Sequence, residues 1–139
     1  MRRTNAIITT LIMLLFLVHL IWGALILMGL VKGGNQLFRF FSYTMMIFIC
    51  VHVLIGIKLS LDSILATRKS GVFYLRENSL FVLRRVSGFA LLIFIAVHFV
   101  IFSGTNEGGV YRLRVFDAMA LISQILMVVS LLLHLVSNI

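Results

Sequence analysis

Four long apolar runs alternate with shorter polar segments along the chain. Each run lacks Asp, Glu, Lys and Arg, and the runs cover residues 4–31, 40–57, 86–106 and 118–139. A helix of about 20 residues, rising about 1.5 Å per residue, crosses the roughly 30 Å hydrocarbon core of a bilayer. The pattern therefore predicts an all-α, integral membrane protein built as a four-helix up-and-down bundle.

The predicted helices follow these runs with small adjustments at their ends. We expect them at about residues 5–31, 38–64, 84–104 and 112–137, in a single transmembrane domain that covers residues 1–139. Short links between spanning helices imply antiparallel neighbours. The N-terminus and the link between the second and third helices hold seven Lys and Arg, against four in the other two links. By the positive-inside rule, both termini face the cytoplasm.

Composition agrees with a membrane location. Hydrophobic residues make up 62% of the chain and charged residues only 12%, too few to cover the surface of a soluble domain. The net charge of +8 is spread over the ends of apolar runs, so anionic lipid head groups are a better counter-charge than nucleic acid. The single cysteine, Cys50, excludes a disulfide scaffold or an iron–sulfur cluster bound by this chain alone.

Each apolar run contains one histidine, and the links contain none. The four are His19, His52, His98 and His134. An ionisable side chain in the hydrocarbon layer is costly, which makes each one a functional candidate. A lone histidine is readily explained as a neutral imidazole hydrogen-bonded to a neighbouring helix. One in every helix indicates a shared role.

The depths of the histidines predict how they pair. At about 1.5 Å per residue, His19 and His98 both lie roughly 20 Å from the cytoplasmic side. His134 lies near that side, and His52 lies in the inner or middle zone. Because the first and third helices of such a bundle are diagonal neighbours, as are the second and fourth, we expect two cross-bundle pairs. They are His19 with His98 and His52 with His134.

Two imidazoles from opposite sides hold a haem iron at both axial positions and leave no position for oxygen, which suits electron transfer. Gly23, Gly56 and Ser130 lie four residues from three of the histidines, where small residues leave room for a flat macrocycle or simply permit close helix packing. Zinc is a rival, because four histidines can complete a tetrahedron, but their different depths argue against it.

Short motifs around the histidines resemble a known family. The segment Arg85-Val-Ser-Gly88, followed after nine residues by His98, is similar to the Arg-x-Ser/Thr-Gly…His segment of cytochrome b anchor subunits of succinate dehydrogenases and fumarate reductases. The neighbourhoods His52-Val-Leu-Ile-Gly56 and Leu133-His-Leu135 resemble those of the ligands on the second and fourth helices of two-haem members. Those members usually have a fifth helix, which this sequence lacks.

The resemblance implies a function and its components. It implies two haem b groups, an outer one ligated by His19 and His98 and an inner one ligated by His52 and His134. The chain would lie in a prokaryotic inner membrane, with flavoprotein and iron–sulfur subunits on its cytoplasmic face. Electrons would pass between those subunits and a membrane quinone, either menaquinone or ubiquinone. The basic link at 68–76 is the best candidate docking surface for the iron–sulfur subunit, with Phe73 and Tyr74 as anchors. Both aromatic residues fit an aromatic belt at the membrane interface equally well.

Further residues are candidates for contacts with these cofactors. Cations at the membrane edges are expected near the haem propionates, since Arg binds carboxylates strongly: Arg84 and Arg85 on the inner side and Arg39 on the outer side. Each of them individually is explained at least as well as a topology determinant at the lipid surface. A quinone site needs an ionisable or hydrogen-bonding group, for which Glu107 and Asp117 on the outer side and Ser87 in the recognised motif are candidates. Asp117 can instead pair with Arg114 at a helix N-terminus.

Two other functions fit parts of the pattern. One is the cytochrome b anchor of another quinone-linked oxidoreductase, such as a formate dehydrogenase or hydrogenase. Those anchors typically place two ligands on one helix, a pattern that is absent here. The other is a haem-free transport or proton-relay bundle, in which the histidines titrate.

Overall fold

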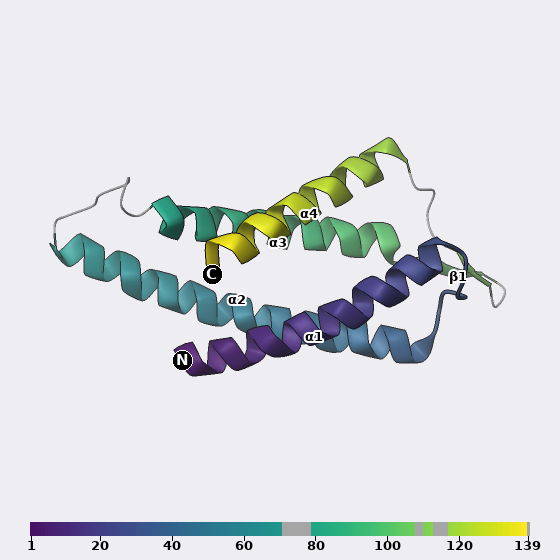
Figure 1. Ribbon diagram of the computed structural model, residues 1–139, viewed down its shortest axis with the longest axis horizontal. Coiled ribbons are helices and arrows are strands. Elements are labelled where there is room, and N and C mark those ends of the chain that lie inside the picture. Colours follow the sequence, from purple (N-terminus) through teal and green to yellow (C-terminus); the bar gives the residue numbers. More distant parts are fainter. Residues whose placement is uncertain (71–78, 108–109, 113–116, 139) are drawn as a thin grey trace. The chain divides into compact units, whose positions relative to one another are not determined.

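The computed structural model describes residues 1–70, 79–107, 110–112 and 117–138. Within them lie four helices, which are α1 (Arg2–Leu27), α2 (Gln36–Ser70), α3 (Ser79–Phe102) and α4 (Ala118–Asn138). Between α3 and α4, the short strands β1 (Thr105–Glu107) and β2 (Val110–Arg112) pair antiparallel (Figure 1). The all-α class predicted from the apolar runs is confirmed.

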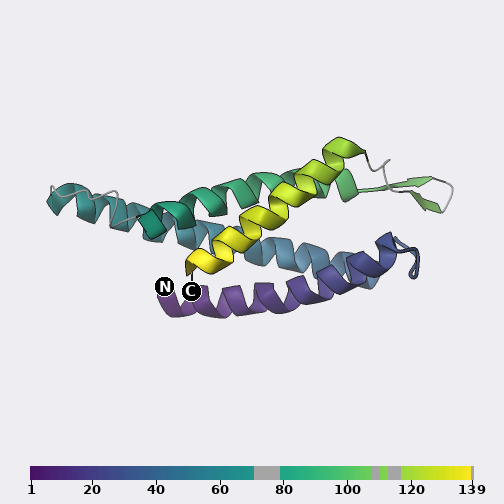
Figure 2. The same cartoon turned by 45° about the horizontal axis from the view of Figure 1, so that its top comes forward.

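The helices pack as two antiparallel pairs. In the first hairpin α1 packs along α2, and in the second hairpin α3 packs along α4, as Figures 1 and 2 both show. These two hairpins are separate compact units of the chain. The predicted packing of both hairpins into one bundle stays a prediction.

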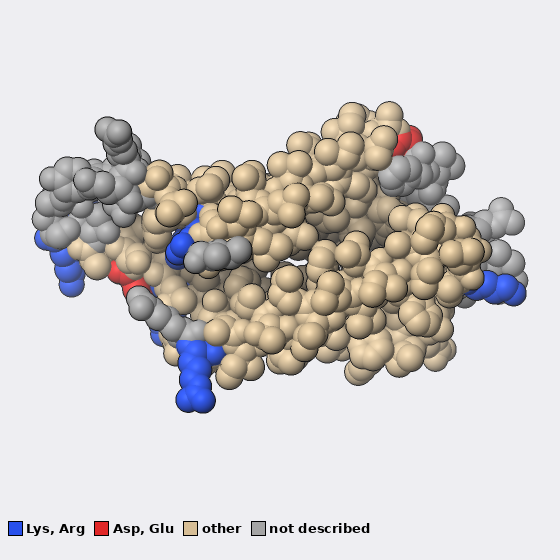
Figure 3. Space-filling model, viewed as in Figure 1, with Lys and Arg blue, Asp and Glu red and all other residues tan. Residues whose placement is uncertain are grey.

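Each described helix is long and apolar enough to cross a membrane, as expected of a multi-pass membrane protein. Leu, Ile, Val and Phe side chains along all four helices are exposed, as lipid-facing residues are. On the face drawn in Figure 3, Lys, Arg, Asp and Glu lie toward the ends of the helices. The 35 residues of α2 give a length of about 52 Å, so this helix exceeds the roughly 30 Å apolar core.

Capping residues explain where α1 ends and α2 begins. Gly29 has a φ of +72°, and the N–H groups of Gly29 and Leu30 donate to the carbonyls of Ile26 and Leu25 at 3.0 and 2.9 Å. This is the Schellman arrangement, which ends α1 at Leu27, four residues earlier than expected. Asn35 then caps α2, because its Oδ1 accepts the N–H of Leu37 at 2.8 Å.

A second capping residue corrects the predicted start of the fourth helix. Oδ1 of Asp117 accepts a hydrogen bond from the N–H of Ala120 at 2.8 Å. The backbone carbonyl of Asp117 accepts one from the N–H of Leu121 at 3.0 Å. Asp117 is therefore the N-cap of α4, which begins at Ala118 and not near residue 112. The predicted start near residue 112 was wrong, since residues 110–112 form β2. Both α2 and α3 extend farther toward residues 71–78 than predicted.

Candidate functional site

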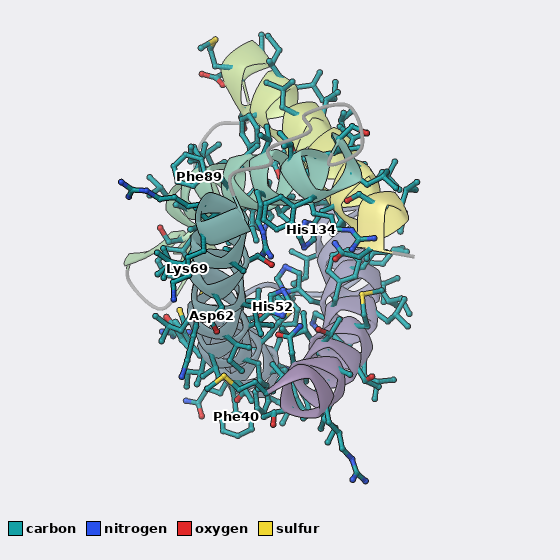
Figure 4. All side chains as sticks on the ribbon, turned by 90° about the vertical axis from the view of Figure 1, so that its left-hand side faces the viewer. Phe40, His52, Asp62, Lys69, Phe89 and His134 are labelled. Carbon is teal, nitrogen blue, oxygen red and sulfur yellow. The ribbon has the colours of Figure 1, made fainter. Side chains whose placement is uncertain are left out.

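In the first hairpin, each histidine faces a hydroxyl on the opposite helix. Nδ1 of His19 on α1 lies 3.1 Å from Oγ of Ser42 on α2. Nδ1 of His52 on α2 lies 3.3 Å from Oγ1 of Thr9 on α1. Figure 4 shows His52 on the side of α2 that faces α1, whereas Lys69 points away. Both histidines therefore lie at the contact between the two helices.

The second hairpin repeats this arrangement. Nδ1 of His98 on α3 lies 2.7 Å from Oε1 of Gln124 on α4. Nδ1 of His134 on α4 lies 3.4 Å from Oγ of Ser87 on α3, and His134 lies between the two helices in Figure 4. Each histidine and the side chain it faces are called a polar pair below.

The hydroxyl partners fix the direction of these hydrogen bonds. Each hydroxyl already donates its single hydrogen to the carbonyl four residues earlier, at 2.9 Å for Thr9 and Ser42 and at 2.7 Å for Ser87. With its hydrogen on that carbonyl, each hydroxyl oxygen accepts from the imidazole, and this arrangement requires the hydrogen of the neutral imidazole to be on Nδ1. In a neutral imidazole the lone pair that can bind a metal is then on Nε2.

The polar pairs lie at two levels in each hairpin. One level is nearer the link between the two helices, and the other is nearer their free ends. Along every helix the two polar side chains are ten or eleven residues apart, or about 15 Å. The level near the link contains His19–Ser42 and His98–Gln124, and the other contains Thr9–His52 and Ser87–His134.

The spacing of about 15 Å bears on the two metal sites considered from the sequence, a pair of haem irons and a single zinc ion. The order of depth within each hairpin agrees with the order predicted from the sequence. Because the two histidines of one hairpin are separated by about 15 Å, all four cannot converge on a single zinc ion. Among the described residues, no three His, Cys, Asp or Glu side chains gather at one point. The pairing of histidines between hairpins stays a prediction.

Aromatic rings flank the histidines nearer the links. The ring of Phe38 stacks on His19, with centroids 5.2 Å apart and planes 17° apart, and Trp22 stacks on the same Phe38. Phe102 lies four residues after His98 on α3, and its ring centroid is 4.7 Å from that of the imidazole. The indole Nε1 of Trp22 is buried without an acceptor among the described residues, so an acceptor on a bound molecule would complete it.

Gly88 is the glycine that the packing of the histidines requires. A Cβ added there would lie 3.0 Å from Cε1 and 3.2 Å from Nδ1 of His134, closer than carbon atoms normally approach. An added Cβ at Gly23 or Gly56 would meet no described atom within 4 Å. Close packing within the α1–α2 hairpin therefore does not explain these two glycines. That they leave space for a ligand stays a prediction.

The predicted propionate contacts have different surroundings. Nε of Arg84 donates to the carbonyl of Ser137, so Arg84 supports the last turn of α4, next to His134. Arg85 lies over the ring of Phe81, with its guanidinium carbon 5.0 Å from the ring centroid. Arg39 is exposed in the first turn of α2. Their contact with propionates stays a prediction.

Of the proposed quinone residues, Ser87 and Asp117 are not brought together. Ser87 is buried against His134, and its hydroxyl donates to the carbonyl of Leu83. Asp117 caps the N-terminus of α4. The backbone of Glu107 lies in β1, but its side chain is outside the described part. Phe73, Tyr74 and Arg114 also lie outside the described residues. A quinone site formed by Glu107 and Asp117 stays a prediction.

Sequence reasoning did not single out Thr9, Ser42, Gln124 or the packing role of Gly88. The signal that was present is a polar residue ten or eleven positions before every histidine. Comparisons of the chain with protein-family models, with curated proteins and with solved structures found no match. Functional inference therefore rests on the residues themselves.

Proposed function

We propose that this chain is a membrane cytochrome b that binds two haem groups and carries electrons between a membrane quinone and peripheral subunits. The observation that carries the proposal is the set of four polar pairs, with one histidine on each described spanning helix and, in each hairpin, one pair near the link and one near the free ends. Hairpins packed side by side would offer two histidines at each of two depths, which matches two haems with two axial ligands each.

The donor chemistry of the histidines supports this proposal. A haem iron binds the neutral imidazole nitrogen that lacks a hydrogen, and metal-bound histidines generally donate their other N–H to a protein acceptor. Two histidines show this arrangement clearly. Nδ1–H of His52 is directed to Thr9, and Nδ1–H of His19 is directed to Ser42, which leaves Nε2 of each ring for the iron. A titrating proton relay has no need for every imidazole to be held in the same tautomer.

Each part of the site has a distinct task under this proposal. His19 and His98 would hold the outer haem, and His52 and His134 the inner haem. Bound haem supplies one-electron transfer through its iron. The polar pairs orient the imidazoles, and the apolar helices exclude water from them. Gly88 gives His134 its place against α3.

The proposal extends to the partners. By its resemblance to succinate dehydrogenase and fumarate reductase anchors, the chain would lie in a prokaryotic inner membrane with both termini in the cytoplasm. Flavoprotein and iron–sulfur subunits would bind on that side. Menaquinone or ubiquinone would react near one haem. Membranes that contain the assembled complex should show haem reduction by succinate or by a quinol, whereas reduction by formate or hydrogen would indicate the alternative anchor class.

Replacing the histidines one at a time tests the ligand assignment. His19→Ala and His98→Ala should remove one spectral component, and His52→Ala and His134→Ala the other. Thr10→Val is a suitable control, because the exposed Thr10 hydroxyl donates only to the carbonyl of Ala6 on its own helix. Loss of the same component in His19→Ala and His52→Ala would show that the pairing between helices is wrong. Full haem content in all four variants would refute histidine ligation.

A further inference from the structure

We propose that Gln124 is a positioning residue that orients His98 and raises the electron density on the nitrogen of His98 that faces the iron. This inference rests on the proposed function, since it concerns the haem that His98 would ligate. Gln124 differs chemically from the other partners of the histidines, because it offers an amide carbonyl in place of a hydroxyl.

A chain of hydrogen bonds fixes the amide of Gln124. The hydroxyl of Ser123 donates to the carbonyl of Ala120 at 2.7 Å, so its oxygen is left to accept. Nε2 of Gln124 donates to that oxygen at 3.3 Å. With its nitrogen placed in this way, Gln124 directs Oε1 to Nδ1 of His98 at 2.7 Å. The imidazole must then be the donor.

The His98–Gln124 contact is the shortest of the four. The other three Nδ1 atoms lie 3.1–3.4 Å from their hydroxyl oxygens. An amide carbonyl at 2.7 Å is a stronger acceptor than a hydroxyl at 3.1–3.4 Å. A stronger acceptor on Nδ1–H makes the imidazole a more basic ligand, and a more basic ligand favours ferric over ferrous haem. We therefore expect Gln124 to lower the midpoint potential of the haem that His98 ligates.

A purely structural role for Gln124 predicts something else. Polar side chains often join spanning helices by hydrogen bonds, and such a residue contributes to packing without acting on a cofactor. Removing it would then change stability or haem content and leave the potential of the remaining haem unchanged. The midpoint potential therefore distinguishes a positioning residue from a packing residue.

Redox titrations of the purified holoprotein, followed by its visible spectrum, provide the test. Gln124→Met keeps a similar volume and removes the strong acceptor. Gln124→Glu keeps an oxygen acceptor at the same position. We expect Gln124→Met to raise one midpoint potential so that the ratio of reduced to oxidised haem changes about tenfold, equal to 59 mV for a one-electron couple. Gln124→Glu should lower that potential, because a carboxylate accepts more strongly than an amide carbonyl.

Two further variants sharpen the result. Ser123→Ala removes the group that holds the amide nitrogen, so it should shift the same potential in the same direction by a smaller amount. Thr10→Val should shift neither potential. If Gln124→Met loses one haem, Gln124→Glu decides: a retained haem with a lowered potential supports the inference, and an unchanged potential assigns Gln124 to packing.

Several outcomes would overturn the inference. Unchanged potentials in Gln124→Met with two haems bound would assign Gln124 to packing alone. Equal increases in Gln124→Met and Gln124→Glu would show that the acceptor has no effect. These outcomes are distinct from failure of the proposed function, in which the parent protein itself would bind no haem.

Discussion

Adding one methyl group at Gly88 should displace His134. The Cβ of Gly88→Ala would lie 3.0 Å from Cε1 of the imidazole, whereas non-bonded carbons pack best at about 3.5–4.0 Å. The ring must therefore move by about 0.5 Å or more. Movement is restricted, because the hydroxyl of Ser87, on the residue preceding Gly88, holds Nδ1 at 3.4 Å.

The size of the effect follows from known costs of overpacking. Inserting a methyl group into a packed contact costs about 1–3 kcal/mol. If this energy destabilises only the state in which the imidazole binds iron, the affinity for the haem that His134 ligates should fall about 5- to 150-fold. Titration of the haem-free protein with haem, read from the visible spectrum, measures this change. Ala96→Val is the control, since it adds carbon to an exposed position of α3.

A double variant separates the clash from other effects of the substitution. Without a clash, replacing glycine by alanine inside a helix stabilises it by about 1 kcal/mol. In the His134→Ala background the clash is absent, so Gly88→Ala should stabilise the haem-free protein against SDS. In the parent background this gain should be cancelled or reversed. Equal effects of Gly88→Ala in both backgrounds would refute the reasoning, because contacting residues must show a coupling energy.

Three other substitutions test single contacts. Arg84→Gln should destabilise the last turn of α4 by about 1–3 kcal/mol, because the charged donor to the Ser137 carbonyl is lost. Amide hydrogen exchange in that turn should then become faster, whereas Arg85→Gln should leave it unchanged. Asp117→Ala should cost about 1 kcal/mol of helix stability, measured by SDS titration, whereas Asp117→Asn should keep the cap. Glu107→Gln should reduce quinone-linked turnover with haem content intact; full turnover would remove Glu107 from the quinone site.

The predictable part of the fold came from the apolar runs. Uncharged stretches of this length have few alternatives to spanning helices. The fold class and the number of helices could therefore be predicted from them directly. The ends of helices were less predictable, because they depend on caps. Gly29 ended α1 early, and Asp117 moved the start of α4 from about 112 to 118. Neither residue is hydrophobic, so an analysis of apolar periodicity alone gives them no weight.

The histidines were identifiable because charge and polarity are costly in a membrane. Their partners were not, since Ser, Thr and Gln are common in spanning helices and only the register of two packed helices selects one of them. Gln124 faces His98 because α3 and α4 pack at one particular register. The same register brings Gly88 against His134, which no pattern within either helix predicts.

The central claim is that two haems are held by four histidines. A reduced-minus-oxidised visible spectrum of the purified chain, with the haem quantified after extraction, tests it most directly. We expect b-type bands, two haems per chain, and a spectrum that carbon monoxide does not change, because both axial positions of each iron are filled. Absence of any haem band, or a single haem per chain, would refute the binding of two haems by the four histidines.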